Sequence, residues 1–228
     1  MEIHILNWDT ENFGFKIGYI EINNCDNLLV EQLKKDAKKE NFKLIYLKSP
    51  SLLNNISLFF DEKLVYSKNQ EKINEFSCPE IESYRNTSII ESEIYDLALK
   101  SGEYSRYKLD NNFPVDCFRV LYKKWIENSI YTDFATDVLV YKIKNKPVGL
   151  LTYKHEEDKS NIGIISVNQE FQGCGIGSKL IKYYHSLLKN KVKVFDVVTQ
   201  GVNNPAKSFY EKNGYKLTSR TYIYHLWI

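Results

Sequence analysis

Several features that mark particular classes of protein are scarce or absent in this chain of 228 residues. Its four cysteines, Cys25, Cys78, Cys117 and Cys174, form no C-x-x-C pair, so we expect four reduced thiols and neither a metal site nor a disulfide framework. No apolar run reaches the roughly 18 residues of a membrane-spanning helix, so no membrane partner is expected. The formal net charge is only +2 and no basic block occurs, which argues against nucleic acid as a partner.

The start of the chain also lacks the charged-then-apolar pattern of a secretion signal, because it carries Glu2 and Asp9 instead. We therefore expect a cytoplasmic protein. Apolar residues make up 43% of the chain and charged residues 26%, proportions that are ordinary for a globular protein. A chain of this length forms one large domain or two modest ones.

Hydrophobic patterning divides the chain into two parts. The pattern of the first part predicts a small β-α-β-α-β unit. A polar stretch over 68–79 indicates a domain boundary after this unit. We therefore expect an N-terminal α/β domain at 1–80, contributing to a substrate site, and a second domain at 81–228. The elements expected in the first domain are strands at 2–6, 16–22, 42–47 and 62–66, and helices after Asp26 and over 52–60.

The second domain is predicted to begin with a strand near 84–90, a helix over 92–102 and a loop over 103–114. The expected elements that follow are a long helix at 115–128, strands at 138–143, 148–153, 162–167 and 192–199, two helices beginning near Gly177 and Pro205, and a closing hairpin at 215–227.

The most informative stretch is the glycine-rich loop after the strand that ends at Val167. Gly173, Gly175 and Gly177 lie within five positions, and an amphipathic helix begins there. The first backbone N–H groups of a helix have no intrahelical partner, and the helix dipole adds positive charge at that end. Glycines let an anion approach these N–H groups closely. The loop therefore predicts a seat for a pyrophosphate, and the alternative is a glycine turn without a ligand.

Two spaced motifs identify the family that the chain resembles. The loop fits neither the dinucleotide fingerprint nor the P-loop pattern. Gln172-x-x-Gly175-x-Gly177 matches instead the Q/R-x-x-G-x-G/A signature of the GCN5-related N-acetyltransferase (GNAT) family. Asn203-x-x-Ala206, followed by Phe209-Tyr210-x-Lys212-x-Gly214-Tyr215, resembles the segment that closes the same family's core. The chain is similar to this family in both segments and in their order.

This resemblance implies a fold and a donor substrate. The expected fold class is α/β (α+β): the GNAT fold, with a mixed, largely antiparallel central sheet flanked by helices, beside the smaller N-terminal α/β unit. The expected donor is acetyl-coenzyme A (acetyl-CoA), with no metal. The resemblance places the pantetheine arm on main-chain groups of Ile165 and Val167, with an N–H near Val167 polarising the thioester carbonyl. The diphosphate would be held by Gln172, Gly173, Cys174, Gly175, Ile176, Gly177 and Ser178.

The resemblance also assigns catalytic roles. Asn203 corresponds to a residue that contacts the pantetheine or sulfur side, and Tyr210 to the general acid that protonates the departing thiolate. The alternative for Tyr210 is a packed core aromatic. No general base can be identified: His185 lies about 12 Å along the helix from the phosphate seat and is expected to be structural. His155, Glu156 and Glu157 end a strand and could lie near the acceptor, although a solvated turn is expected there.

A narrower resemblance concerns the acceptor. Trp8-Asp9-x-x-x-Phe13-Gly14-Phe15 and Ser105-Arg106-Tyr107 look like segments of sugar N-acetyltransferases such as dTDP-fucosamine acetyltransferase. This similarity implies transfer to the amine of a nucleotide-linked amino sugar in surface-polysaccharide synthesis, by direct attack in a ternary complex. Phe13 and Arg106 are then candidate substrate contacts, although Phe13 could simply anchor the N-terminal unit and Arg106 could lie on the surface. Another amine acceptor, a non-catalytic CoA sensor and a homodimer remain open.

Overall fold

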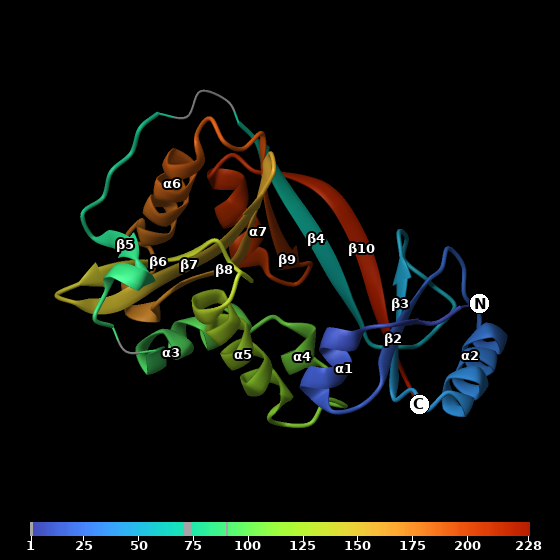
Figure 1. The fold of residues 1–228 in the computed structure, drawn as a ribbon. Helices are drawn as coiled ribbons and strands as arrows, with labels where there is room; N and C mark the ends of the chain where they lie inside the picture. Colours follow the sequence, from blue (N-terminus) through green and yellow to red (C-terminus); the bar gives the residue numbers. More distant parts are fainter. Residues whose placement is uncertain (1, 71–73, 90) are drawn as a thin grey trace.

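The computed structural model describes residues 2–70, 74–89 and 91–228. Within these residues the strands form one sheet of ten, in the order β1-β2-β3-β10-β4-β9-β8-β7-β6-β5. The pairs β2/β3 and β8/β9 are parallel, and the other neighbours are antiparallel. Helices cover both faces (Figure 1). The predicted mixed, mostly antiparallel sheet flanked by helices is confirmed.

The ten strands are β1 (His4–Ile5), β2 (Ile17–Glu21), β3 (Leu44–Ser49), β4 (Phe60–Asn69), β5 (Ile81–Ser83), β6 (Asp137–Ile143), β7 (Lys146–Glu156), β8 (Lys159–Val167), β9 (Val194–Gln200) and β10 (Lys216–Trp227). The helices are α1 (Asn7–Phe13), α2 (Asn27–Lys39), α3 (Glu91–Ser101), α4 (Arg106–Leu109), α5 (Cys117–Tyr131), α6 (Ile176–Leu188) and α7 (Asn204–Lys212). Short 3₁₀ turns lie at Tyr84–Asn86 and Gln169–Phe171. No helix in the described part of the chain is long and apolar enough to cross a membrane.

Two buried clusters assign the helices around β6–β9 to opposite faces of the sheet. Leu180 and Tyr184 of α6 share one cluster with Tyr210 of α7. Ile94 of α3 and Ile126 of α5 share a different cluster, with Trp125 packed against it. Helices α6 and α7 therefore cover one face, and α3 and α5 cover the other (Figure 1).

Four predictions about individual elements are wrong. Residues 52–60 form no helix: Asn54 and Asn55 form a turn, as adjacent asparagines favour, and the backbone N–H of Leu53 donates to the hydroxyl of Tyr224 (2.7 Å). The strand expected near 84–90 lies at 81–83 and ends in the 3₁₀ turn; residue 90 falls outside the described residues. The expected loop over 103–114 contains α4.

The closing hairpin predicted at 215–227 is the fourth wrong prediction, because β10 is a single long strand. It lies between β3 and β4, and β4 in turn pairs with β9. Figure 1 shows β4 and β10 running from the N-terminal elements to the rest of the sheet. Elements from the first 80 residues therefore share one sheet with the last strand of the chain, and the division into 1–80 and 81–228 stays a prediction.

Candidate functional site

The site is built where two parallel strands part. β8 and β9 pair only from Lys159 opposite Val194 to Ile162 opposite Val197. Beyond that point β8 stays paired with β7 as far as Val167, whereas β9 stays paired with β4. A gap therefore opens between the second halves of β8 and β9.

Main-chain groups of β8 point into this gap. The N–H of Asn168 donates to Val148 on β7 (2.8 Å), and the N–H of Ile164 donates to Oγ1 of Thr152 on β7 (2.9 Å). Successive residues of a strand present their main-chain groups to alternate sides. The N–H and C=O groups of Ile165 and Val167 therefore face away from β7, toward the gap. The Val167 carbonyl already accepts a bond from Nε2 of Gln172 (3.2 Å).

The glycine-rich loop lies beyond the open end of the gap. Gly173 and Gly175 have φ values of 79° and 78°, and a Cβ added at either would meet no atom within 4 Å. Gly175 is the N-cap of α6 and supplies no side-chain acceptor to it. The first-turn N–H groups, from Ile176 to Ser178, therefore lack the usual partner. This arrangement fits an anion.

Gly177 has a different reason to be glycine. A Cβ at this position would lie 3.0 Å from the ring of Phe209 on α7, so the glycine allows α6 and α7 to pack closely. Ile176 is buried, whereas Gln172 and Cys174 are exposed on the loop. The predicted phosphate residues thus divide into an open loop and a packed first turn of α6.

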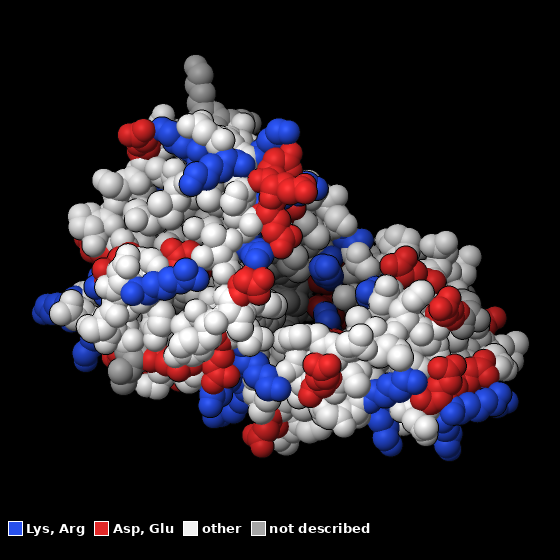
Figure 2. Space-filling model, in the orientation of Figure 1, with Lys and Arg blue, Asp and Glu red and all other residues white. Residues whose placement is uncertain are grey.

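A cavity of about 910 Å³ passes through the gap between β8 and β9. Ala206 and Tyr210 line it from α7 on one face, and Tyr122 and Trp125 line it from α5 on the other. Its remaining polar lining includes Asp9, Lys48, Asp61, Lys63, Asn203 and Arg106. Figure 2 shows a recess in the middle of the molecule with basic and acidic side chains at its mouth. Ile165 lines the cavity; the glycine-rich loop does not.

Tyr210 and Asn203 enter this cavity from α7 and its N-cap. The Tyr210 side chain is 4% exposed and packs near the rings of Tyr66 and Tyr215. Burial raises the pKa of its phenol well above the usual value, so the hydroxyl keeps its proton at neutral pH. Oδ1 of Asn203 accepts from the N–H of Ala206 (3.2 Å) and so caps α7.

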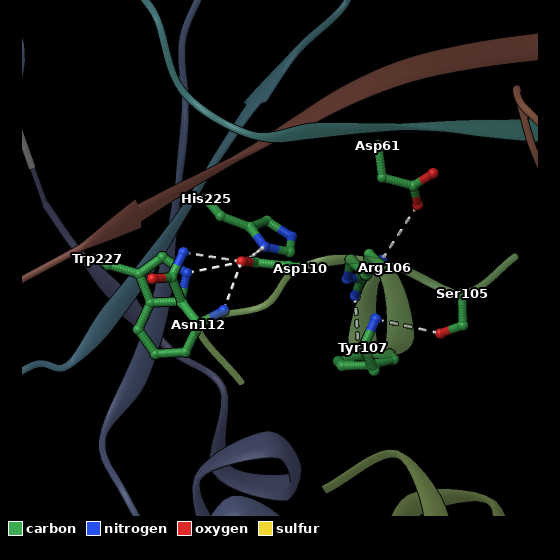
Figure 3. A network of polar contacts seen from close by, with 8 residues as sticks. All are labelled: Asp61, Ser105, Arg106, Tyr107, Asp110, Asn112, His225 and Trp227. Atoms are coloured by element: carbon green, nitrogen blue, oxygen red, sulfur yellow. Dashed lines mark hydrogen bonds and ion pairs between the residues drawn. The ribbon is translucent and has the colours of Figure 1, made fainter. Parts of the chain in front are cut away.

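Arg106 also lines the cavity, between two tyrosine rings and one acid; Figure 3 shows its contacts with Tyr107 and Asp61. Its guanidinium lies 4.9 Å from the ring centre of Tyr46 and 4.6 Å from that of Tyr107, and it donates to the Tyr107 hydroxyl (2.7 Å). A guanidinium nitrogen lies 4.0 Å from Oδ2 of Asp61. Arg106 is thus not on the outer surface, and its buried Nε has no hydrogen-bond partner among the residues that the structure describes.

Asp61 is the most perturbed carboxylate in the cavity. Burial raises its pKa to about 6, with a further increase from Glu62, although the charge of Arg106 opposes the rise. Asp9 of α1 lines the same cavity, and burial also raises its pKa. Sequence analysis did not single out Asp61, and it quoted Asp9 only as part of the segment from Trp8 to Phe15. The signal for Asp61 would have been an acidic residue inside a predicted strand. The strand was predicted at 62–66, so it began one residue after Asp61.

A buried network fixes α4 and therefore Arg106 (Figure 3). Oδ2 of Asp110, the residue after α4, accepts from Nδ1 of His225 (2.6 Å) and Nε1 of Trp227 (2.8 Å) on β10. Oδ1 accepts from the backbone and side-chain nitrogens of Asn112. Burial acts to raise the pKa of Asp110, but these hydrogen bonds outweigh it and leave the pKa at about 2.

Phe13 and His185, which sequence analysis considered for functional roles, do not line the cavity. Phe13 packs on Tyr107 and Phe113, with ring centres 5.3 and 5.4 Å apart, in an aromatic cluster behind the cavity lining. His185 is buried on α6, and its Nε2 lies 2.9 Å from the hydroxyl of Tyr215. Burial lowers the pKa of His185 to about 3. The described residues contain no group of three or more His, Cys, Asp or Glu side chains placed to hold a metal.

Comparison with known proteins adds a family model and one curated relative. Residues 135–217 match the acetyltransferase (GNAT) domain. The uncharacterized protein YxbD of Bacillus subtilis (strain 168) is 36% identical over 74 residues, which are 32% of this chain. The match spans 45% of that protein's length, so less than half of the relative is represented.

Solved structures extend the likeness to most of the chain. A functionally unknown conserved protein from Staphylococcus epidermidis ATCC 12228 aligns with a TM-score of 0.63 at 15% identity, over 95% of this chain and 87% of that one. A GCN5-related N-acetyltransferase from Sphaerobacter thermophilus aligns with a TM-score of 0.53 at 10% identity, over 88% and 68% of the two chains. At these identities the likeness shows the fold. The protein has the GNAT fold, and residues 135–217 match the GNAT domain model.

Proposed function

We propose that the protein transfers the acetyl group of acetyl-CoA to an amine. The observation that carries this proposal is the gap between β8 and β9, through which one cavity reaches both faces of the sheet. A donor can enter from the glycine-rich loop and an acceptor from the side of Arg106. The two substrates then meet without a covalent enzyme intermediate, because transfer in a ternary complex needs only that they lie in contact.

The donor would lie along β8 from the loop toward the closed end of the gap. The N–H groups at the start of α6 would bind the diphosphate, because they lack partners and carry the positive end of the helix dipole. The pantetheine arm would pair with the main-chain groups of Ile165 and Val167 that face the gap, where the Val167 carbonyl already accepts from Gln172. Because the thioester is at the far end of this arm, we assign the N–H that polarises its carbonyl to Ile165. Ile165 lies two residues before the Val167 that sequence analysis favoured.

The chemistry would be attack of a neutral amine nitrogen on the thioester carbon. A C–N bond forms, the C–S bond breaks, and the sulfur leaves as a thiolate. Tyr210 keeps its proton at neutral pH and lines the cavity beside the gap. Its hydroxyl would donate a hydrogen bond that strengthens as negative charge develops on sulfur.

For the acceptor, we propose the amine of a nucleotide-linked amino sugar. The two segments that resemble sugar N-acetyltransferases both contribute side chains to the cavity, namely Asp9 from one and Arg106 and Tyr107 from the other. Lys48 and Lys63 also line it and offer positive charge to a diphosphate. A volume of about 910 Å³ suits a ligand of this size beside the acetyl end of the donor.

The experiment is a calorimetric titration with acetyl-CoA, followed by turnover of a panel of amines that includes nucleotide-linked amino sugars, polyamines and amino acids. Gly175→Val places a side chain in the phosphate seat and should remove both binding and turnover. Gly14→Val is the matched control for acetyl-CoA binding, because Gly14 also has a positive φ (74°) and open space around a Cβ. It imposes the same backbone strain far from the loop.

Three results would contradict parts of this proposal. Equal acetyl-CoA affinity in the wild type and in Gly175→Val would remove the loop from donor binding. Binding without turnover of any amine would favour a CoA sensor. Turnover of simple amines in preference to nucleotide-linked sugars would retain the transferase and discard the sugar acceptor.

A further inference from the structure

We propose that Asp61 is the base that takes the proton from the acceptor amine. This assignment rests on the proposed acetyltransferase function and fills the role for which the sequence offered no residue. An amine in water at neutral pH is mostly an ammonium ion, and it must lose a proton before its nitrogen can attack. A carboxylate within the acceptor part of the cavity is suited to bind that ammonium and to receive the proton.

The strand register places Asp61 next to the gap. β4 lies beside β9, with Lys63 opposite Gln200. The N–H of Gly201 donates to the carbonyl of Glu62 (2.8 Å), so Asp61 is level with the residues just after β9. Its side chain lines the cavity and is 7% exposed. Asp9, a partly exposed acid, reaches the cavity from α1, which is not part of the sheet.

The partners of Asp61 leave it able to accept a proton. Its only ion pair in the described part of the chain is the loose contact with Arg106 at 4.0 Å. The pKa of about 6 means that the carboxylate is ionised at neutral pH, yet it is a much better base than an ordinary aspartate. Catalytic bases work best when their pKa is close to the working pH.

Arg106 on α4 and Glu62 on β4 act on the charge of this carboxylate. The other charged or titratable groups that line the cavity are Glu21 on β2, Tyr46 and Lys48 on β3, Lys63 on β4, Asp9 on α1, Tyr107 on α4, Tyr122 on α5 and Tyr210 on α7. His225 on β10 lies behind this lining, with its ring 4.9 Å from that of Tyr46. The pKa of His225 is lowered by burial, against the opposing effect of its bond to Asp110. His225 stays in place in an Asp61 variant, so its titration can be separated from that of Asp61.

The proposed reaction conserves protons. The ammonium gives one proton to Asp61, and the neutral nitrogen forms the new C–N bond. The nitrogen then loses a second proton, and the sulfur gains one as the C–S bond breaks, through Tyr210 or solvent. The products are an amide with one N–H and the free thiol of CoA. Asp61 returns its proton to solvent.

The test is the pH profile of kcat/KM for the amine, at saturating acetyl-CoA, in the wild type and Asp61→Asn. In the wild type the reactive pair is the ammonium and the carboxylate, so kcat/KM should rise to about pH 6 and then level off until the amine itself titrates. In Asp61→Asn we expect a loss of about 10²–10⁴-fold at pH 7. Without a base, only free amine reacts, and kcat/KM should keep rising up to the amine's own pKa.

Two variants control for structural effects. Glu62→Gln removes a carboxylate from the adjacent position of β4, where the side chain pairs with Arg220 (3.4 Å) outside the residues that line the cavity. It should keep the rise and the plateau of the wild-type profile, with the rise moved to slightly lower pH because the charge of Glu62 raises the pKa of Asp61. Asp61→Glu keeps a carboxylate and should keep the plateau at a reduced rate, which makes the test independent of how well the amide variant folds. The affinity for acetyl-CoA should be unchanged in all three.

Three results would overturn the role of Asp61 or the proposed function. An active wild type together with an Asp61→Asn profile of unchanged shape overturns the role of Asp61 alone. A raised KM for the amine with the plateau retained also overturns it, because Asp61 would then only bind the acceptor. A wild type that turns over no amine overturns the proposed function, and this inference with it.

Discussion

Replacing Asp61 by asparagine should stabilise the protein at neutral pH. Folding raises the pKa of this carboxyl from 3.8 to about 6, because burial disfavours the charged form. The folded protein therefore holds a proton that the unfolded chain releases between these values, and stability falls as the pH rises through this window. A shift of about two pKa units corresponds to about 3 kcal/mol. Above pH 6 the wild type bears this whole cost, whereas an amide does not.

The assay is urea unfolding of the wild type and Asp61→Asn at several pH values from 4 to 8. The two unfolding free energies should be nearly equal at pH 4, and the variant should be the more stable by up to about 3 kcal/mol at pH 7. Glu62→Gln is the control, and its more accessible ion pair with Arg220 should change stability by less than about 1 kcal/mol.

Two results would refute this reasoning. A difference that does not vary with pH would mean that folding leaves the pKa of Asp61 unchanged. A variant that is less stable than the wild type at pH 8 would mean that the ion pair with Arg106 outweighs the cost of burying the carboxylate.

Two further predictions concern Tyr210 and Asp110. Tyr210→Phe keeps the ring and its packing, so it should lower kcat by about 10²–10⁴-fold with little change in acetyl-CoA affinity; a kcat close to the wild type, measured where chemistry limits the rate, would make Tyr210 a core aromatic only. Asp110→Ala leaves the buried donors of His225 and Trp227 unpaired and should cost about 3–5 kcal/mol in urea unfolding. Asp116→Ala, which removes an exposed side chain without a capping bond, should cost less than about 0.5 kcal/mol; equal losses in the two variants would refute a structural role for the Asp110 network.

The donor side of the site could be predicted because its signals are local. Gly175 needs a positive φ at the start of a helix, and the loop and α6 follow each other directly in the sequence. Asn203 and Pro205 mark the start of α7 in the same way. Residues that meet a local backbone requirement are adjacent in the sequence. They form a short motif that can be recognised without knowledge of the tertiary contacts.

The acceptor side could not be predicted because it depends on distant pairings. Asp61, Tyr46 and Arg106 come from β4, β3 and α4, and β10 separates the two strands in the sheet. The pattern at 215–227 was interpreted as a hairpin, since alternation alone does not tell whether a strand turns back or continues between two others. Once β10 is one strand between β3 and β4, Asp61 comes to lie opposite Ile223 and faces the cavity.

The central claim is that acetyl-CoA occupies the gap between β8 and β9, and a structure of the protein with bound CoA tests it most directly. We expect the diphosphate to accept hydrogen bonds from the N–H groups at the start of α6, and the pantetheine arm to pair with Val167 and Ile165. The sulfur should then lie near the hydroxyl of Tyr210. A diphosphate bound elsewhere, or an arm that leaves the gap between Ile165 and Val198 empty, would contradict the account.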